Sequence, residues 1–475
     1  MNPFTVYLLV HLLRILVWNQ PLVVSDTAAA FIKTSADSIA LVHAKVFDGS
    51  GNPALLDQTV LIKNGRILAI GHSGDVPVPE AYETWDASGM TLLPGLIGTH
   101  NHLRLPQGAL LYTGPKLYLA CGVTTIQTCG TGHPAEELAL ARAIEEGRYP
   151  GPEIIPSSPY FTGRQGRDHF VRFTEEKKVR DTIRYWARQG VAWFKVYRNT
   201  RPEDLRVIVD EAHRQGAKVT GHLCATSYSE AAQIGIDAIE HGFIHAFDFA
   251  SDRVPGTCSG NVDFRSTLGV QEPVVQELIQ LLIKQGVAIS STPAILEAQA
   301  RGLADPRSLE AMDAFHVQAY QRRRKERESR AGEGGVKEAW LLRSLEFDRA
   351  FFRAGGLLTA GPDPGLHVLP GYGDQKNYEL FIEAGFEPQA AVQILTANGA
   401  RLLGRTDIGK VQPGMRADLL LLDGDLQADP RVIRNPVLVF KEGKGYDPQK
   451  LLQAVKGKVG AAMDDTWRVD GKPMP

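Results

Sequence analysis

The 475-residue sequence has little cysteine, almost no net charge and no long apolar run beyond its first thirty residues. Its formal net charge of −2 argues against a nucleic-acid partner. Four cysteines without a CxxC pair argue against a structural zinc ribbon, although the even number leaves one or two disulfides open. Since no later segment reaches the roughly 20 apolar residues of a membrane helix, we expect no stable membrane insertion of the mature chain.

Residues 1–30 differ from the rest of the chain. An apolar stretch from Phe4 to Trp18 is followed by Ala28-Ala29-Ala30, and this order is typical of a secretion signal with a small-residue cleavage site. We therefore expect a signal peptide over 1–30 and export to the periplasm or the extracellular space. Because the apolar run has no basic residue before it and is interrupted by a His and an Arg, a cytoplasmic location stays the alternative.

Strand-like runs punctuated by turn residues stand at both ends of the chain. Asn64-Gly65 separates two alternating apolar runs, the pattern of a β-hairpin. We predict a small β-sandwich domain formed from residues 36–93 and 404–445, with a C-terminal tail over 446–475. Between its two parts, residues 94–403 alternate strand-like and helical stretches, which predicts an α/β fold with a (β/α)8 TIM barrel as the catalytic domain.

Several of the predicted strands end in residues that can bind a metal. His100 and His102 are two positions apart, so their imidazoles point to the same side of a strand and make half of a metal site. Three further strand candidates end in His222, His241 and Asp363. Because the carboxyl ends of barrel strands face one pocket, these residues can share a centre. Taken singly, each histidine can be a core residue, and Asp363 can cap a helix.

Lys195 stands within the apolar strand segment WFKVY. Burial of its ammonium group is costly unless its pKa falls or an acid pairs with it. Addition of CO2 to the amine would give a carbamate able to bridge two cations, while an acid-paired, Schiff-base or proton-relay lysine stays open. Tyr197 lies on the same side of this strand and is a candidate for binding an oxyanion or a substrate carboxylate, or a core tyrosine.

The segments PGLIGTHNH, GVTTIQT, WFKVY, VTGH, IEHG, TAGPD, TANGARLLG and IGKVQPGMRADLLLLD resemble, in this order, the landmark segments of the amidohydrolase superfamily. The resemblance spans residues 40–444 and is greatest to its imidazolonepropionase-like and prolidase-like (dipeptidase-like) group. It implies a binuclear metal centre: one metal on His100 and His102, the other on His222 and His241, with carboxylated Lys195 bridging and Asp363 near the attacking water. Zinc suits these ligands best, and manganese, iron, cobalt or nickel are alternatives.

Two stretches depart from the pattern of this superfamily. Gly98 stands where many relatives have an acid, and Gln127-Thr128 where many have an Arg-Asp pair. The loop FTGRQGRDHF also differs from close relatives. Its residues Arg164 and His169 are candidates for binding a substrate carboxylate, and an exposed polar loop is the other interpretation.

The resemblance and the charges of such a centre predict a hydrolase that cleaves a C–N bond in an amide, a dipeptide or a cyclic amide. A metal-bound hydroxide would attack, and Asp363 would act as the general acid and base. The alternatives are a lactone or phosphoester hydrolase with the same centre, or a mononuclear deaminase with unmodified Lys195. All six ligands are present, which disfavours a non-catalytic scaffold. We expect a small-molecule substrate and leave open a homo-oligomer.

Overall fold

The computed structural model describes residues 27–105, 108–167, 170–329, 333–365 and 367–460. Most of the predicted signal peptide, residues 1–26, and the candidate His169 therefore lie outside the described residues. Export and a role for His169 stay predictions. Among the helices of these ranges, none combines the length and the apolar character that crossing a membrane requires.

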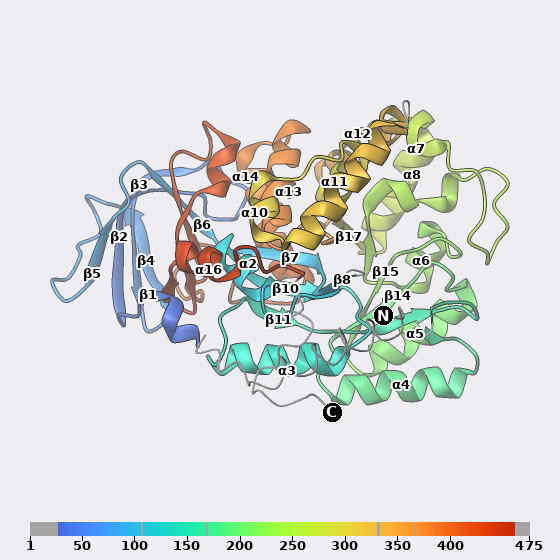
Figure 1. Cartoon of the computed structure of the whole chain (residues 1–475), viewed down its shortest axis with the longest axis horizontal. Coiled ribbons are helices and arrows are strands. Elements are labelled where there is room, and N and C mark those ends of the chain that lie inside the picture. Colours follow the sequence, from blue (N-terminus) through green and yellow to red (C-terminus); the bar gives the residue numbers. More distant parts are fainter. Residues whose placement is uncertain (1–26, 106–107, 168–169, 330–332, 366, 461–475) are drawn as a thin grey trace, which may run out of the picture.

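Strands from the two ends of the chain pair in one nine-stranded sheet, at the left of Figure 1. Its order is β1-β21-β20-β19-β6-β2-β3-β4, with β5 beside β2. The strands are β1 (Ile32–Thr34), β2 (Ser38–Val46), β3 (Leu55–Lys63), β4 (Arg66–His72), β5 (Glu83–Asp86), β6 (Met90–Pro94), β19 (Leu419–Asp423), β20 (Pro436–Lys441) and β21 (Lys444–Tyr446). The pairing of both chain ends agrees with the sequence, whereas the sandwich form and the exact domain boundaries stay predictions.

Local chemistry explains the hairpin within this sheet. Asn64 and Gly65 join β3 to β4 with φ angles of 49° and 76°. Both values lie in the left-handed region that a type I′ turn requires and that Asn and Gly tolerate. Buried apolar side chains such as Ile39, Leu41 and Leu419 form the core of this sheet.

The middle of the chain holds two parallel sheets. The smaller, in the order β11-β10-β7, consists of β7 (Leu96–Asn101), β10 (Val123–Thr128) and β11 (Glu153–Ile155). The larger, in the order β13-β12-β14-β15-β16-β17-β18, consists of β12 (Ser157–Thr162), β13 (Val171–Arg172), β14 (Trp193–Val196), β15 (Lys218–Gly221), β16 (Ala238–Glu240), β17 (Ala288–Ser291) and β18 (Leu358–Ala360). Strands buried on both faces and joined by helices are typical of α/β proteins.

Hydrogen bonds join the two parallel sheets at two places. Thr99 Oγ1 on β7 lies 2.9 Å from Thr359 Oγ1 on β18, and both are edge strands of their sheets. At the second place, the backbone N–H of Ser157 on β12 donates to Thr128 Oγ1 on β10 over 2.9 Å, and neither of these strands is at an edge. Among the described residues, the strand pairing does not close into one continuous ring, and the structure shows a mixed α/β fold.

Helices follow most of the parallel strands and cover them (Figure 1). They include α2 (Gly114–Ala120), α3 (Pro134–Glu145), α4 (Glu176–Arg188), α5 (Pro202–Arg214), α6 (Tyr228–Ile234), α8 (Pro273–Lys284), α9 (Pro293–Ala300), α13 (Tyr372–Glu383), α14 (Pro388–Gln393), α15 (Gly399–Leu402) and α16 (Pro448–Val455). In α5, the buried stripe of Leu205, Ile208, Val209 and Ala212 faces the sheet, as its 3.6-residue spacing predicts.

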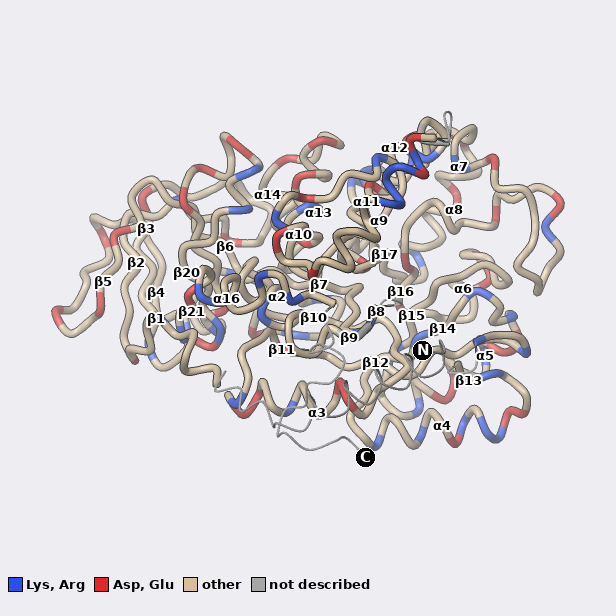
Figure 2. The backbone as a smooth tube through the Cα atoms, in the orientation of Figure 1, with Lys and Arg blue, Asp and Glu red and all other residues tan. Residues whose placement is uncertain are grey.

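An arm of further helices separates β17 from β18. It consists of α10 (Pro306–Ala311), α11 (Ala314–Glu328) and α12 (Glu333–Arg353). Figure 2 shows Lys and Arg positions gathered along this arm among Asp and Glu positions. α11 buries none of its residues, and Arg324 pairs with Glu328 over 2.9 Å on its surface. α11 therefore contributes a charged, solvated surface, whereas α12 buries Leu341, Leu345, Phe347 and Phe351 in the core.

Candidate metal centre

The six predicted ligands all lie at the carboxyl ends of parallel strands. His100 is in β7 and His102 follows it, and Lys195 is in β14. His222, His241 and Asp363 come just after β15, β16 and β18. The fold therefore brings together residues that are up to 263 positions apart, because parallel strands end at one edge.

Asp363 is the point at which three of the histidines meet. Its Oδ1 lies 3.5 Å from His100 Nε2 and 3.3 Å from His102 Nε2, and its Oδ2 lies 3.8 Å from His241 Nδ1. Donor atoms of His100, His241 and Asp363 all fall within 4.8 Å of one another. The arrangement has the size and the chemistry of a cation site, because imidazole nitrogens and a carboxylate are ligands that zinc prefers.

His222 and His241 form the second part of the cluster. His222 Nδ1 lies 2.9 Å from His241 Nε2, and His222 Nε2 is buried without a hydrogen-bond partner. On the other side, His241 Nδ1 lies 3.0 Å from Thr292 Oγ1. The facing nitrogens of His222 and His241 are close enough to share one cation.

The backbone at two of these residues adopts a conformation that ordinary residues avoid. His241 has a φ of 67° and Asp363 a φ of 47°, both in the left-handed region. Such angles cost free energy and are retained where the surrounding structure over-determines them, often at functional sites. Here they turn each side chain into the cluster directly after its strand ends.

Lys195 lies close to both groups of histidines, because its charge acts on His100 as well as on His222 and His241. Its Nζ forms a close ion pair with Glu240 Oε2, and both side chains are almost completely buried. Burial lowers the pKa of the Lys195 ammonium group. This contact corresponds to the acid-paired lysine, one of the interpretations that the sequence left open, and carboxylation of Lys195 stays a prediction.

Glu240 is the residue of the site that the sequence interpretation missed. Its Oε1 accepts hydrogen bonds from Thr220 Oγ1 at 2.7 Å and from Cys129 Sγ at 2.8 Å. Its Oε2 contacts Lys195 and lies 3.6 Å from His100 Nδ1. The available signal was an acid in the apolar strand segment AIEHG, since an acid inside a buried strand needs a partner.

His245 was missed as well. Its ring centre lies 4.2 Å from that of His222 and 5.2 Å from that of His241, and its Nδ1 has no hydrogen-bond partner. It ends the short 3₁₀ helix η2 (Gly242–His245). A fifth imidazole thus lies beside the second pair, at a spacing of four residues from His241 that the sequence displayed.

Burial favours the neutral form of three histidines of the cluster, and the imidazoles around Asp363 favour its charged form. Burial lowers the pKa of His100 and His222 well below the usual range, and that of His241 to about 3. Burial alone would raise the pKa of Asp363, but the neighbouring His100, His102 and His241 lower it well below its ordinary value. Neutral imidazoles and an ionised carboxylate are the forms that bind metals.

One wall of the site is aromatic. The ring of Tyr197 lies 4.9 Å from that of His222, and it contacts the rings of Tyr160 and Phe170 edge-on at 5.8 and 5.2 Å. Burial raises the pKa of the Tyr197 hydroxyl, so the group stays a hydrogen-bond donor. Arg164 is exposed on the loop after β12, and none of the described contacts links it to the cluster.

The model of the Amidohydrolase family matches residues 375–445. Over longer ranges, the chain is 22% identical to an ochratoxinase of Aspergillus niger, with 90% of this chain and 88% of that protein covered. It is 25% identical to an imidazolonepropionase of Streptomyces griseus subsp. griseus, with 79% and 88% covered.

Solved structures with the same fold include a Xaa-Pro dipeptidase with methionine bound in its active site. It has a TM-score of 0.65 and 18% identity, and the match covers 86% of this chain and 100% of that one. The A. niger ochratoxinase has a TM-score of 0.64 and 16% identity, covering 90% and 100%. These likenesses establish the shared fold.

Proposed function

This chain belongs to the amidohydrolases and is a hydrolase acting on carbon–nitrogen bonds, and from this premise we propose that it cleaves the amide bond of a dipeptide, another amide or a cyclic amide. The proposed site holds two divalent cations on His100, His102, Lys195, His222, His241 and Asp363. The observation that carries the proposal is the convergence of four imidazoles and one carboxylate from four strand ends.

The proposed architecture is a closed (β/α)8 barrel. It is supported by eight of the parallel strands, β7, β10, β12, β14, β15, β16, β17 and β18, and by the hydrogen bonds that join the two sheets at two places. In such a barrel every strand would deliver its last residues to one pocket. The nine-stranded sheet from both chain ends is proposed to fold as a small β-sandwich domain beside it.

When bound, two divalent cations would supply an acidified water and polarise the substrate carbonyl. Asp363 is placed to accept the proton of the attacking water and to pass it to the leaving nitrogen, because its carboxylate is held ionised among the imidazoles. Tyr197 would donate its hydroxyl hydrogen to the oxyanion or to the substrate carboxylate.

On the Tyr197 side of the site, two arginines would bind a substrate carboxylate. The positive charges of Arg198 and Arg167 act on the Tyr197 hydroxyl and oppose the rise of its pKa. Both guanidinium groups are exposed, so they can be reached from solvent. A dipeptide has a free carboxylate next to its amide bond. The two arginines therefore support a dipeptide among the amide substrates that we propose.

The second candidate is a one-metal centre, as in a deaminase-like hydrolase with unmodified Lys195. The Lys195–Glu240 ion pair favours it, because an ammonium group held by an acid cannot serve as a metal ligand. The same pair is compatible with two cations if carboxylation releases the lysine.

Elemental analysis separates these proposals. The full chain is loaded with zinc in bicarbonate, and its zinc content is compared with that of Lys195→Ala and His100→Ala. Lys218→Ala serves as the control, because Lys218 is also a lysine in a strand but donates to the Leu402 carbonyl. Two zinc ions per chain that fall in both site variants support the binuclear centre. One ion that is indifferent to Lys195 supports the second candidate, and none overturns both.

We also propose that the chain is exported. The described residues contain a disulfide between Cys224 and Cys258, which is typical of oxidising compartments, while Cys121 and Cys129 are buried thiols. Expression of the full chain with fractionation of the cells, followed by N-terminal sequencing, tests this. Cleavage near Ala30 supports export, and an intact chain in the cytoplasm contradicts it.

A further inference from the structure

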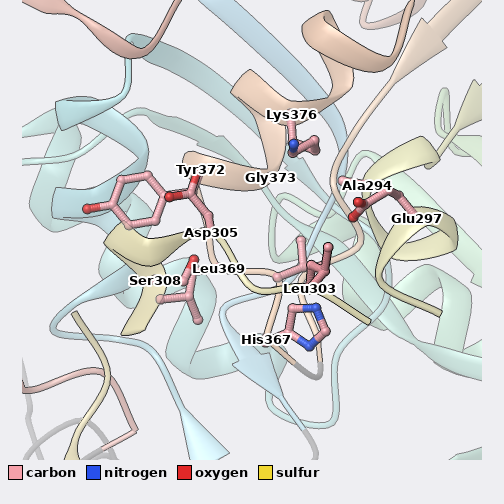
Figure 3. A pocket seen from close by; sticks show the side chains of 11 residues that line it. Ala294, Glu297, Leu303, Asp305, Ser308, His367, Leu369, Tyr372, Gly373 and Lys376 are labelled. Carbon is pink, nitrogen blue, oxygen red and sulfur yellow. The ribbon is translucent and has the colours of Figure 1, made fainter. Parts of the chain in front are cut away.

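A cavity lies beside the loop that follows Asp363, between α9, α10 and α13 (Figure 3). It measures about 290 Å³ including its open mouth, and its inner part has room for only a small polar group. A space of that size admits a head group of one or two heavy atoms. The wall is largely apolar, with Leu303 at the surface and Val368 and Leu369 inside.

Glu297 on α9 is the unusual residue of this cavity. Its side chain is only 7% exposed, and it makes no hydrogen bond or ion pair within the described residues. Figure 3 shows its carboxylate turned toward the space that the lining side chains surround. A buried carboxylate without a partner is costly, and burial accordingly raises its pKa. The cost is explained if a ligand supplies the missing donor.

His367 adds a second unused acceptor. It is 6% exposed, and its ring hydrogen-bonds to the backbone of Leu303. Its Nε2 is buried and has no hydrogen-bond partner among the described residues. Burial lowers the pKa of His367 to about 4, because its effect is larger than that of the hydrogen bond, which raises the pKa. The imidazole therefore stays neutral, and Nε2 offers a lone pair.

The cations near the cavity are already engaged. Lys376 at the rim pairs with Glu379 over 3.0 Å, and Arg307 pairs with Asp305 over 2.7 Å. No guanidinium or ammonium group of the described residues lies within ion-pair distance of the Glu297 carboxylate. The charges of Lys376 and of Arg301, which pairs with Glu338 over 2.9 Å, act on Glu297 from a greater distance. The cavity therefore presents acceptors and one acid without a direct ion pair to whatever enters it.

We infer that this cavity binds the ammonium group of a small primary amine, with three N–H donors directed at the Glu297 carboxylate and at His367 Nε2. An ammonium group has donors only, carries the compensating charge and fits the narrow part of the space. An attached alkyl chain would leave through the mouth along Leu303. The site is separate from the metal centre, and the inference does not rest on the proposed function.

Binding of n-propylammonium to the metal-loaded full chain, followed by calorimetry or saturation-transfer NMR at constant ionic strength, tests the inference. We expect the wild type to bind it in preference to tetramethylammonium, which has no N–H donor. Glu297→Gln should weaken binding at least tenfold, while the exposed Glu310→Gln on neighbouring α10 should leave it unchanged. If Glu297→Gln does not fold, Leu303→Trp, which fills the mouth, should abolish binding instead.

Three results would overturn the inference. One is no binding by the wild type, which would leave the cavity to water. Another is equal binding of tetramethylammonium, which would reflect charge alone. The third is binding that survives both Glu297→Gln and Leu303→Trp, because the amine would then be held elsewhere, for example at the metal centre.

Discussion

Replacement of Glu240 by Gln tests whether this carboxylate positions the metal ligands. Its Oε2 faces Lys195 and lies 3.6 Å from His100 Nδ1, while Thr220 and Cys129 fix its Oε1. A carboxylate behind a metal-binding histidine orients the ring and raises its basicity, and its loss costs about 10- to 100-fold in metal affinity. We expect Glu240→Gln to weaken zinc binding by this factor.

The same change leaves a buried lysine without its partner. Breaking a buried ion pair on one side costs about 3 to 5 kcal/mol of folding stability. The metal-free variant should therefore unfold at lower urea, and Lys195→Met combined with Glu240→Gln should recover much of that loss without restoring zinc affinity. This double variant separates the structural effect from the effect on the ligands.

The assay is zinc competition with a chromophoric chelator, together with urea unfolding of the metal-free chain. Asp348→Asn is the matched control, since Asp348 is also a fully buried carboxylate but bonds to Ser291 rather than to a ligand. The reasoning fails if Glu240→Gln binds zinc like the wild type, or if Asp348→Asn loses as much affinity.

Three further outcomes are expected. Burial raises the pKa of Asp348 from 3.8 to about 7. Its protonated form therefore stabilises the fold fully below pH 3.8, and this stabilisation is lost as the pH rises to about 7. The free energy of unfolding in urea should fall less over this pH range in Asp348→Asn than in the wild type. Because the Cys224–Cys258 disulfide closes a 34-residue separation, replacing both residues by Ser should lower the free energy of unfolding by up to about 4 kcal/mol, and an unchanged urea midpoint would contradict this. Tyr197→Phe should lower kcat on a dipeptide by about 100-fold with little change in KM, whereas a rise in KM alone would assign the hydroxyl to ground-state binding.

The ends of the parallel strands were the part of the site that sequence could predict. His100 and His102 share a strand face through their spacing, and His222, His241 and Asp363 each follow an apolar run. The ends of parallel strands converge because of the topology, so these residues could be grouped without knowing any contact between them. The structure accordingly brings these five side chains together.

The partners of those residues could not be predicted in the same way. Glu240 meets Cys129 across 111 positions, and Thr292 meets His241 across 51, so each contact depends on packing that no local pattern encodes. The cysteine count allowed one or two disulfides, and only the fold brings Cys224 to Cys258. The cavity at Glu297 likewise arises where the neighbouring helices α9 and α10 meet α13, which comes much later in the sequence.

The Lys195–Glu240 pair links carboxylation of the lysine to metal binding. With an ammonium group at Lys195 the pair is neutral, whereas a carbamate would place a second negative charge next to Glu240. Two like charges about 4 Å apart repel by about 4 kcal/mol at an effective dielectric constant of 20. A carbamate without cations is therefore disfavoured in this buried site, and each divalent cation offsets that repulsion. It follows that carboxylation of Lys195 and occupancy of the second cation position should rise together with bicarbonate, while a lysine that stays paired with Glu240 leaves a single cation on His100, His102 and Asp363.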